Sequence, residues 1–321
     1  MKYNLTNQTY IVLLVFLFLF GCSKNKFAPK KESYTNYPDS ISLLYDLGKN
    51  KKADFSKRLG YLNLAQNLIL KKEVFDTLLL AKIYSLKNAI FSKTNVRDSS
   101  FFYAKKLLAV SIIKKDTLMI GKAYFKFADY YKKKSKLDSA YYFFSRSKEM
   151  YSSQGHNSEV GKKLMAMARI LTDDGDHYTS ETTSIDALDY LVPGIDDKYI
   201  ASTYLNLSLA LRNQYAYDEA LAYVKKGLQI ASNPINKIKL LNSKAIIFSQ
   251  KKEYDKSIQT YSQILKDSIV KKNKKEYARI KDNIAFTQWL SNKSLNVEKK
   301  LITALNLRKS LNDTSGLIAS Y

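Results

Sequence analysis

Residues 121–144 read GKAYFKFADYYKKKSKLDSAYYFF, and this stretch decides the fold. Apolar residues recur every three or four positions on both sides of a short basic segment, as expected for two amphipathic helices joined by a turn. Ala128 in the first helix and Ala140 in the second are small residues twelve positions apart. Small side chains at such points allow two helices to approach closely, so we predict a tightly packed helix pair.

The same two small positions recur along the chain. The first falls at Ala128, Ala168, Ser208, Ala245 and Ala285, and its partner falls at Ala140, Ser180, Ala220, Ser257 and Val297. Both series advance by 40, 40, 37 and 40 residues, so two independent anchors keep one step pattern and indicate an internal repeat. Weaker copies precede them, with Asn88 paired to Ser100 and Gly48 paired to Gly60.

This pattern resembles the tetratricopeptide repeat (TPR), in a long-loop form near 40 residues. The strings KLDSA at 136–140, YDEAL at 217–221 and EYDKS at 253–257 carry the resemblance best. It covers the chain from about Ile41 and implies an all-α, right-handed superhelical solenoid of about seven helix pairs, whose first helices line a concave groove. Departures from the pattern are Lys244, Lys281 and Gln288 at expected apolar positions, and the large Val297 in a small slot.

The composition favours the same fold class. The chain has 10 Gly and 4 Pro among 321 residues, and 45% of its residues are hydrophobic. Strand-rich folds and disordered tracts are usually richer in Gly and Pro, which helices exclude from their interiors. These counts argue against a β-sandwich, a β-barrel or a long disordered tail.

The N-terminus carries a second resemblance. The apolar run from Ile11 to Phe20 is too short to span a bilayer and is typical of the apolar region of a signal peptide. Leu19-Phe20-Gly21-Cys22 resembles the bacterial lipobox, which implies cleavage between Gly21 and Cys22, diacylation of the Cys22 thiol and acylation of the new amino terminus. An ordinary secretory signal or a short uncleaved anchor is the alternative, since Lys2 is the only charge before the apolar run.

We therefore predict five segments. These are a lipoprotein signal peptide at 1–21, a lipidated N-terminus and polar tether at 22–38, two divergent repeats at 39–118, five clearer repeats at 119–315 and the start of a truncated repeat at 316–321. Because the next small position would fall beyond Tyr321, we expect a fragment of a longer chain, or a last helix pair that another protein covers.

Little in the sequence predicts catalysis. One cysteine excludes an internal disulfide and the four-ligand zinc sites that need at least two cysteines. The segment DDGDH at 173–177 is rich in oxygen ligands, but it lacks the spacing and distal Glu of a calcium loop, so we favour a solvated turn between two helices. His156 and His177 make no metal-ligand spacing, and no phosphate loop or nucleophile elbow is visible. We predict no enzyme activity, catalytic residue, cofactor or metal.

The resemblance instead places a binding groove on the first helices. Phe125, Met165 and Leu205 occupy a position that basic or amide side chains hold in carboxylate-clamping repeats, so we expect no such clamp. We expect the mixed surface to suit an amphipathic or extended peptide. For Phe286 and Trp289, packing against the next repeat is the alternative, and for most of the 25 tyrosines we favour core packing over stacking on nucleic acid. The predicted groove residues are Lys122, Phe125, Asp129, Arg169, Leu205, Leu209, Arg212, Phe286 and Trp289.

The formal charge of +24 needs its own explanation. Lysine runs such as 132–134 and 271–275 suit solvated helix ends, and we expect the remaining charge to attract anionic lipid or envelope glycans. We predict a lipid-anchored scaffold or assembly protein of the bacterial cell envelope, in the inner or the outer membrane. A sensory region whose kinase or DNA-binding output lies beyond this chain is the first alternative. A basic nucleic-acid-binding array is the second, and it requires the signal peptide to be wrong.

Overall fold

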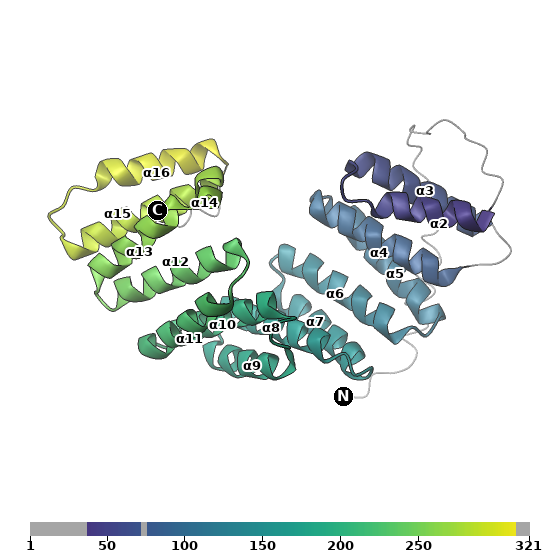
Figure 1. The fold of residues 1–321 in the computed structure, drawn as a ribbon, viewed down its shortest axis with the longest axis horizontal. Coiled ribbons are helices and arrows are strands. Elements are labelled where there is room, and N and C mark those ends of the chain that lie inside the picture. The colour runs from purple at the N-terminus through teal and green to yellow at the C-terminus, as the bar shows by residue number, and fades with distance from the viewer. Residues whose placement is uncertain (1–36, 72–75, 313–321) are drawn as a thin grey trace. The chain divides into compact units, whose positions relative to one another are not determined.

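The computed structural model describes residues 37–71 and 76–312, and every regular element in these ranges is a helix (Figure 1). The predicted signal peptide, Gly21, Cys22, nearly all of the tether and the truncated repeat at 316–321 lie outside the described residues. The helices are α2 (Tyr37–Lys49), α3 (Phe55–Lys71), α4 (Thr77–Lys93), α5 (Arg97–Ile113), α6 (Thr117–Lys133), α7 (Leu137–Ser152), α8 (Asn157–Asp174), α9 (His177–Tyr190), α10 (Asp197–Asn213), α11 (Tyr217–Ile230), α12 (Pro234–Gln250), α13 (Tyr254–Lys266), α14 (Ser268–Lys272), α15 (Lys274–Ser291) and α16 (Glu298–Ser310).

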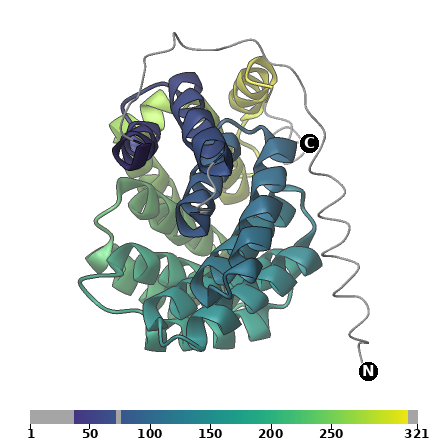
Figure 2. The same ribbon diagram turned by 90° about the vertical axis from the view of Figure 1, so that its right-hand side faces the viewer.

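Within the described ranges the helices form seven consecutive pairs, from α2 with α3 to α15 with α16, and α14 is a short extra helix before the last pair. This arrangement confirms the predicted all-α repeat fold. The chain divides into two compact units, which we call the N-terminal unit (Met1–His156, with α2 to α7) and the C-terminal unit (Asn157–Tyr321, with α8 to α16). The helix pairs can be followed from two directions in Figures 1 and 2. No helix of the described ranges is long and apolar enough to cross a membrane.

From α6 to α13 the predicted small positions lie where the helices of a pair touch. The placement of Val297 in a second helix is wrong, because the six-residue connection after α15 makes Val297 the N-cap of α16. Ala128 of α6 and Ala140 of α7 are both fully buried. In two later pairs the serine at the second position also donates a hydrogen bond to the carbonyl at the first. Ser180 Oγ lies 2.8 Å from Ala168 O, and Ser257 Oγ lies 2.7 Å from Ala245 O. These serines therefore join the helices by a bond as well as by their small size, which the sequence pattern alone did not show.

The weaker copies are confirmed in part. Asn88 Nδ2 donates to Ser100 O over 2.7 Å, as a paired position should. Gly48 is also needed, because a Cβ there would lie 2.5 Å from Leu62 Cγ. The pairing of Gly48 with Gly60 is wrong, since a Cβ at Gly60 would meet nothing within 4 Å. The five-residue connection between α2 and α3 is longer than the two or three residues between the helices of the next pairs, and it shifts the buried face of α3 by two residues.

Five consecutive turns, from the one after α4 to the one after α8, share a backbone device. A residue with positive φ recurs there every twenty positions, and the N–H of the next residue donates to a carbonyl five residues back, as in Lys136 N to Tyr131 O at 3.0 Å. Gly175 lies in the turn between α8 and α9, as predicted, and Asp176 then accepts a hydrogen bond from Thr179 N at the start of α9. The residues with this conformation include Asn95 (φ 60°), Lys115 (55°), Ser135 (55°), Gly155 (69°) and Gly175 (93°).

Candidate functional site

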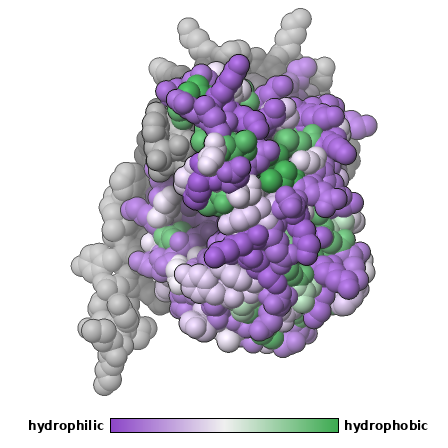
Figure 3. Space-filling view, turned by 90° about the vertical axis from the view of Figure 1, so that its left-hand side faces the viewer, coloured by the Kyte–Doolittle hydropathy of each residue, from purple (hydrophilic) through white to green (hydrophobic). Residues whose placement is uncertain are grey.

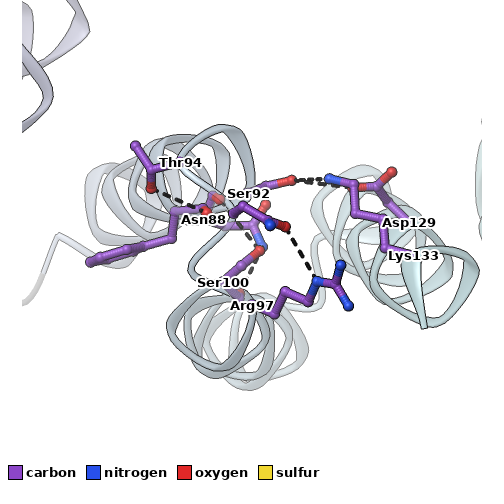
Figure 4. A network of polar contacts seen from close by, with 9 residues as sticks. Asn88, Ser92, Thr94, Arg97, Ser100, Asp129 and Lys133 are labelled. Atoms are coloured by element: carbon purple, nitrogen blue, oxygen red, sulfur yellow. Dashed lines mark hydrogen bonds and ion pairs between the residues drawn. The ribbon is translucent and has the colours of Figure 1, made fainter. Parts of the chain in front are cut away.

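The first helices of the N-terminal unit place a group of charged side chains on one face of α6. Lys122, Lys126, Asp129 and Lys133 follow at helical spacing. Lys133 Nζ lies 2.9 Å from Asp129 Oδ2 and donates to Ser92 Oγ of α4 over 2.6 Å. Ser92 Oγ in turn donates to Asp129 Oδ2 over 3.2 Å, which closes a small network between α4 and α6 (Figure 4). The Asp129 carboxylate is therefore already engaged.

Lys126 is the unusual member of this face. Its side chain is half-buried, and neither Lys126 nor Lys122 has a hydrogen-bond or ion-pair partner among the residues that the structure describes. Burial lowers the pKa of Lys126 to about 8; the Lys122 and Lys133 cations act in the same direction, and Asp129 opposes them. The α6 face therefore holds an ammonium group that the fold does not neutralise.

The aromatic residues near this face mainly pack within the unit. Phe125, a predicted groove residue, lies edge-on to Phe144 of α7 with ring centroids 5.8 Å apart. Tyr130 stacks on Phe101 of α5 at 4.3 Å, and Tyr131 stacks on Phe143 at 5.4 Å. These contacts confirm the interpretation of the adjacent tyrosines as packing residues.

In the C-terminal unit, two predicted arginines lie on neighbouring first helices. Arg169 of α8 pairs with Asp173 one turn away, at 2.9 Å. Arg212 of α10 donates to Asn213 Oδ1 over 3.0 Å, and no carboxylate of the described residues lies within ion-pair distance of it. Burial lowers the pKa of the Arg212 guanidinium, and the Arg169 cation lowers it further. The structure thus brings these two cations into electrostatic contact.

The predicted leucines and aromatics of this unit differ in exposure. Leu205 is only 8% exposed and belongs to the core between α10, α11 and α12, and Leu209 packs against the same core. Phe286 and Trp289 of α15 are 52% and 37% exposed, with ring centroids 5.8 Å apart. Lys293 Nζ lies 3.1 Å from the centroid of the Trp289 ring, so the lysine covers one face of the ring. On the side where Figure 1 places α13 and α15, Figure 3 shows small apolar patches between hydrophilic side chains.

Sequence reasoning missed Lys126 and Ser92. The signal for Lys126 was its position four residues after Lys122, which places both on one helix face. Ser92 had no comparable signal, because its role depends on the packing of α4 against α6. At 173–177, Asp173 pairs with Arg169 and Asp176 caps α9, so both side chains serve the local helices. No group of three metal-binding side chains occurs in the described ranges.

Comparison with known proteins agrees with this architecture. No family model matches the chain. A curated relative, the photosystem I assembly protein Ycf3 of Prochlorococcus marinus, is 33% identical over 78 residues, which span 24% of this chain and 45% of the relative. The matched segment is therefore less than half the length of that relative.

Several solved structures share the fold at low sequence identity. A signal transduction ATPase with a tetratricopeptide repeat sensor from Pyrococcus horikoshii has a TM-score of 0.68 and 15% identity, over 86% of this chain and 43% of that one. The apo quorum sensor NprR from B. thuringiensis has a TM-score of 0.61 and 14% identity, over 88% of this chain and 84% of that one. A Rap protein complexed with Competence and Sporulation Factor has a TM-score of 0.60 and 16% identity, over 91% of this chain and 86% of that one. The chain therefore has a tetratricopeptide-like helical repeat fold, as its repeat spacing predicted.

Proposed function

We propose that this chain is a TPR-type scaffold that binds a protein segment along its first helices and is held at a bacterial membrane by lipidated Cys22. The observation that carries the binding role is the set of groups on these helices that packing leaves unneutralised, chiefly Lys122, Lys126 and Arg212. The solved Rap complex supports it, since a protein of this fold was captured with a bound factor.

The binding role can be tested by peptide display on the detergent-solubilised full-length protein. We expect the selected peptides to lose affinity for Arg212→Ala and Trp289→Ala variants, because both side chains lie on first helices. Tyr178→Ala is the matched control, since Tyr178 is 74% exposed on the second helix α9. A protein that selects no peptide, or whose peptides respond only to Tyr178→Ala, would contradict the proposal.

Membrane anchoring rests on the sequence Leu19-Phe20-Gly21-Cys22. The test is the intact mass of the protein extracted from its native membrane, with Cys22→Ala alongside. A chain that begins at Cys22 and carries added acyl mass supports the anchor, as does release of Cys22→Ala from the membrane fraction. An unprocessed chain without acyl groups would overturn the anchor and favour the nucleic-acid alternative.

A sensory region is the second candidate function. Two of the solved structures with this fold are described as a quorum sensor and as a protein with a tetratricopeptide repeat sensor. In that case the kinase or DNA-binding output would lie beyond this chain. A mass greater than that of a chain ending at Tyr321, together with a coding sequence that continues into such a module, would favour sensing over a scaffold.

A further inference from the structure

The connections between successive helix pairs of the C-terminal unit carry an excess of lysine. Residues 225–239, which include the connection from α11 to α12, contain four lysines and no Asp or Glu. Residues 264–275, which lead through α14 to α15, contain five lysines and one acid, Asp267. The Asp267 carboxylate accepts a hydrogen bond from Ile269 N over 2.7 Å, so it serves the start of α14. We call residues 225–239 and 264–275 the basic edge.

Packing holds the two segments of the basic edge together. Helices of a repeat array alternate in direction, so the connections between pairs lie at one end of the helices. Ile238 of α12 and Val270 of α14 belong to one buried cluster. In Figure 1, the connection from α11 to α12 and the short helix α14 lie at the same end of this unit. The preceding connection, from α9 to α10, is acidic at Asp196 and Asp197 and marks the limit of the basic edge.

Two isoleucines are exposed on the basic edge. Ile235 is 53% exposed in the first turn of α12, and Ile269 is 39% exposed in α14. Lys237, Lys271 and Lys272 beside them are exposed, and no carboxylate of the described residues lies within ion-pair distance of these three. A single exposed isoleucine needs no explanation. Apolar side chains among unpaired lysines, however, match a surface that is anionic outside and apolar beneath.

The opposite end of the same helices differs. In the turn between α12 and α13, Lys251 pairs with Asp218 and also with Glu253, the latter at 3.6 Å. Lys256 pairs with Glu253 at 2.6 Å. Two of the three lysines at 251–256 are therefore neutralised within the chain, which leaves less charge for an outside partner than at the basic edge.

We propose that the basic edge docks the C-terminal unit onto an anionic phospholipid bilayer, with Ile235 and Ile269 inserted between the lipid headgroups. Lysines near an anionic leaflet are attracted to it, and inserted aliphatic side chains add apolar burial. A nucleic acid matches the edge less well. Residues 225–239 and 264–275 contain no arginine to form a forked contact with phosphate and no aromatic ring on which bases could stack.

This docking goes beyond the peptide-binding function proposed above. It also does not depend on lipidation of Cys22, because the residues that carry it lie in the repeats. A protein that is acylated at Cys22 but does not use the basic edge would keep its anchor and lack the docking surface. A protein that uses the edge without acylation would show the reverse.

The experiment attaches the environment-sensitive dye NBD to a single cysteine of the full-length Cys22→Ala protein, which has no other thiol. Ile269→Cys places the dye on the basic edge. Tyr215→Cys places it at the opposite end of the helices, at a 77% exposed position in the turn between α10 and α11. On addition of vesicles with 30% phosphatidylglycerol at 50 mM salt, we expect the emission of NBD at 269 to shift to shorter wavelength, because the dye enters an apolar environment. NBD at 215 should change little.

Charge reversal tests the attraction. Lys271→Glu with Lys272→Glu should raise the lipid concentration needed for half of the signal at 269 at least about tenfold. Lys252→Glu with Lys299→Glu makes the same change of charge at exposed positions of the opposite end. It should change that concentration no more than about twofold, because exposed charges far from the bilayer are screened. Vesicles of pure phosphatidylcholine should give no response.

Replacement of an isoleucine tests the insertion. Ile235→Ser should weaken vesicle binding about fivefold through lost apolar burial. Ile302→Ser, at an isoleucine of similar exposure (46%) on α16, should not weaken it. Circular dichroism checks that each variant is folded.

The proposal is overturned if NBD at 269 does not respond to the vesicles, if NBD at 215 responds equally, or if the two charge-reversal variants behave alike. It is also overturned if phosphatidylcholine vesicles give the same response. Duplex DNA that displaces the protein from the vesicles at an equal concentration of phosphate would replace the bilayer by a nucleic acid as the partner of this edge.

Discussion

Lys87 of α4 is a lysine at a position where the fold buries a side chain. It is 1% exposed, its Nζ donates to Gln66 Oε1 over 2.5 Å, and the centroid of the Tyr103 ring lies 5.1 Å away. Burial lowers the pKa of Lys87 to about 7, and the Lys106 cation contributes. The unfolded chain therefore binds more protons than the folded chain between pH 7 and the ordinary lysine pKa of 10.5, so this group makes stability rise with pH over that window.

We expect Lys87→Met to stabilise the protein, because methionine fills a similar volume without a charge to desolvate. The gain should be about 2 kcal/mol or more at pH 6 and should become smaller toward pH 9, where Lys87 is already neutral in the folded state. Urea unfolding at the two pH values measures it. Equal stability of wild type and variant at pH 6 would show that the Gln66 and Tyr103 contacts offset the desolvation.

Tyr215 provides a test of the turns. Its φ is 65°, a conformation that costs a residue with a Cβ about 1 kcal/mol, and its side chain is 77% exposed. Tyr215→Gly should therefore raise the free energy of unfolding by about 0.5 kcal/mol, after the greater entropy of the unfolded glycine is deducted. Tyr178→Gly, at an exposed position in the first turn of α9 without positive φ, should bring no such gain, because the helical backbone there does not require glycine. Loss of stability in Tyr215→Gly would contradict this account.

At the residue scale, the sequence predicted what depends on side-chain size. Ala128 and Ala140 could be assigned to a helix contact because small residues at a fixed spacing have few other uses. Lys126 could not be assigned, since its importance comes from burial and from the commitment of Asp129 to Lys133 and Ser92. A list of charges gives neither property.

At the scale of elements, replacing two helical glycines by alanine should change stability in opposite directions. A Cβ at Gly161 of α8 would lie 2.8 Å from Leu191 Cγ and 3.0 Å from the Ala187 carbonyl, whereas one at Gly60 of α3 would meet nothing within 4 Å. Gly161→Ala should destabilise by about 1–2 kcal/mol because α8 and α9 must separate. Gly60→Ala should stabilise by about 1 kcal/mol through helix propensity alone. Parallel denaturant titrations of the two variants measure both changes in stability. A gain in stability for Gly161→Ala as well would mean that α9 moves away from α8 at little cost.

The helix pairs were predictable, and their exceptions were not. Seven pairs follow from the spacing of two small positions. The extra helix α14 lies inside a 40-residue step and does not change that spacing, so the spacing could not predict it. The five-residue connection before α3 does change the spacing, and a fixed repeat frame therefore placed Gly60 two residues away from the buried face. Insertions in turns leave the helical pattern intact on both sides, so the pattern gives no measure of their length.

At the scale of the whole molecule, the net positive charge is the property most relevant to binding an anionic surface. Cleavage before Cys22 would remove only Lys2, so 52 Lys and Arg against 29 Asp and Glu leave +23. We expect residues 23–321 to bind vesicles with 30% phosphatidylglycerol at 50 mM salt and to dissociate at 500 mM, where screening shortens the range of the interaction to a few ångströms. Sedimentation with vesicles measures it, and pure phosphatidylcholine is the control. Binding that survives high salt would indicate apolar insertion.

The fold of the molecule was thus predictable where the partner was not. The repeat frame records core positions such as Ala168 and Ala245, which are both fully buried. The exposed pair Phe286 and Trp289, and the cations of α6, lie outside that frame. On the function proposed above, we expect binding specificity to depend on those residues, for which a single sequence has no periodic signal.

The turns at Asn95, Lys115 and Ser135 also determine how such a chain can change length. Each of these three residues has the same left-handed backbone conformation, and each lies twenty positions after the previous one. Deletion of residues 96–135 would join Asn95 to Lys136, so α4 would lead into α7 through an unchanged turn, with Asn88 facing Ala140 in place of Ser100. Gene duplication or deletion between such turns would add or remove a whole helix pair and leave the turn at the junction unchanged. The number of repeats can therefore evolve independently of the chemistry on their surface.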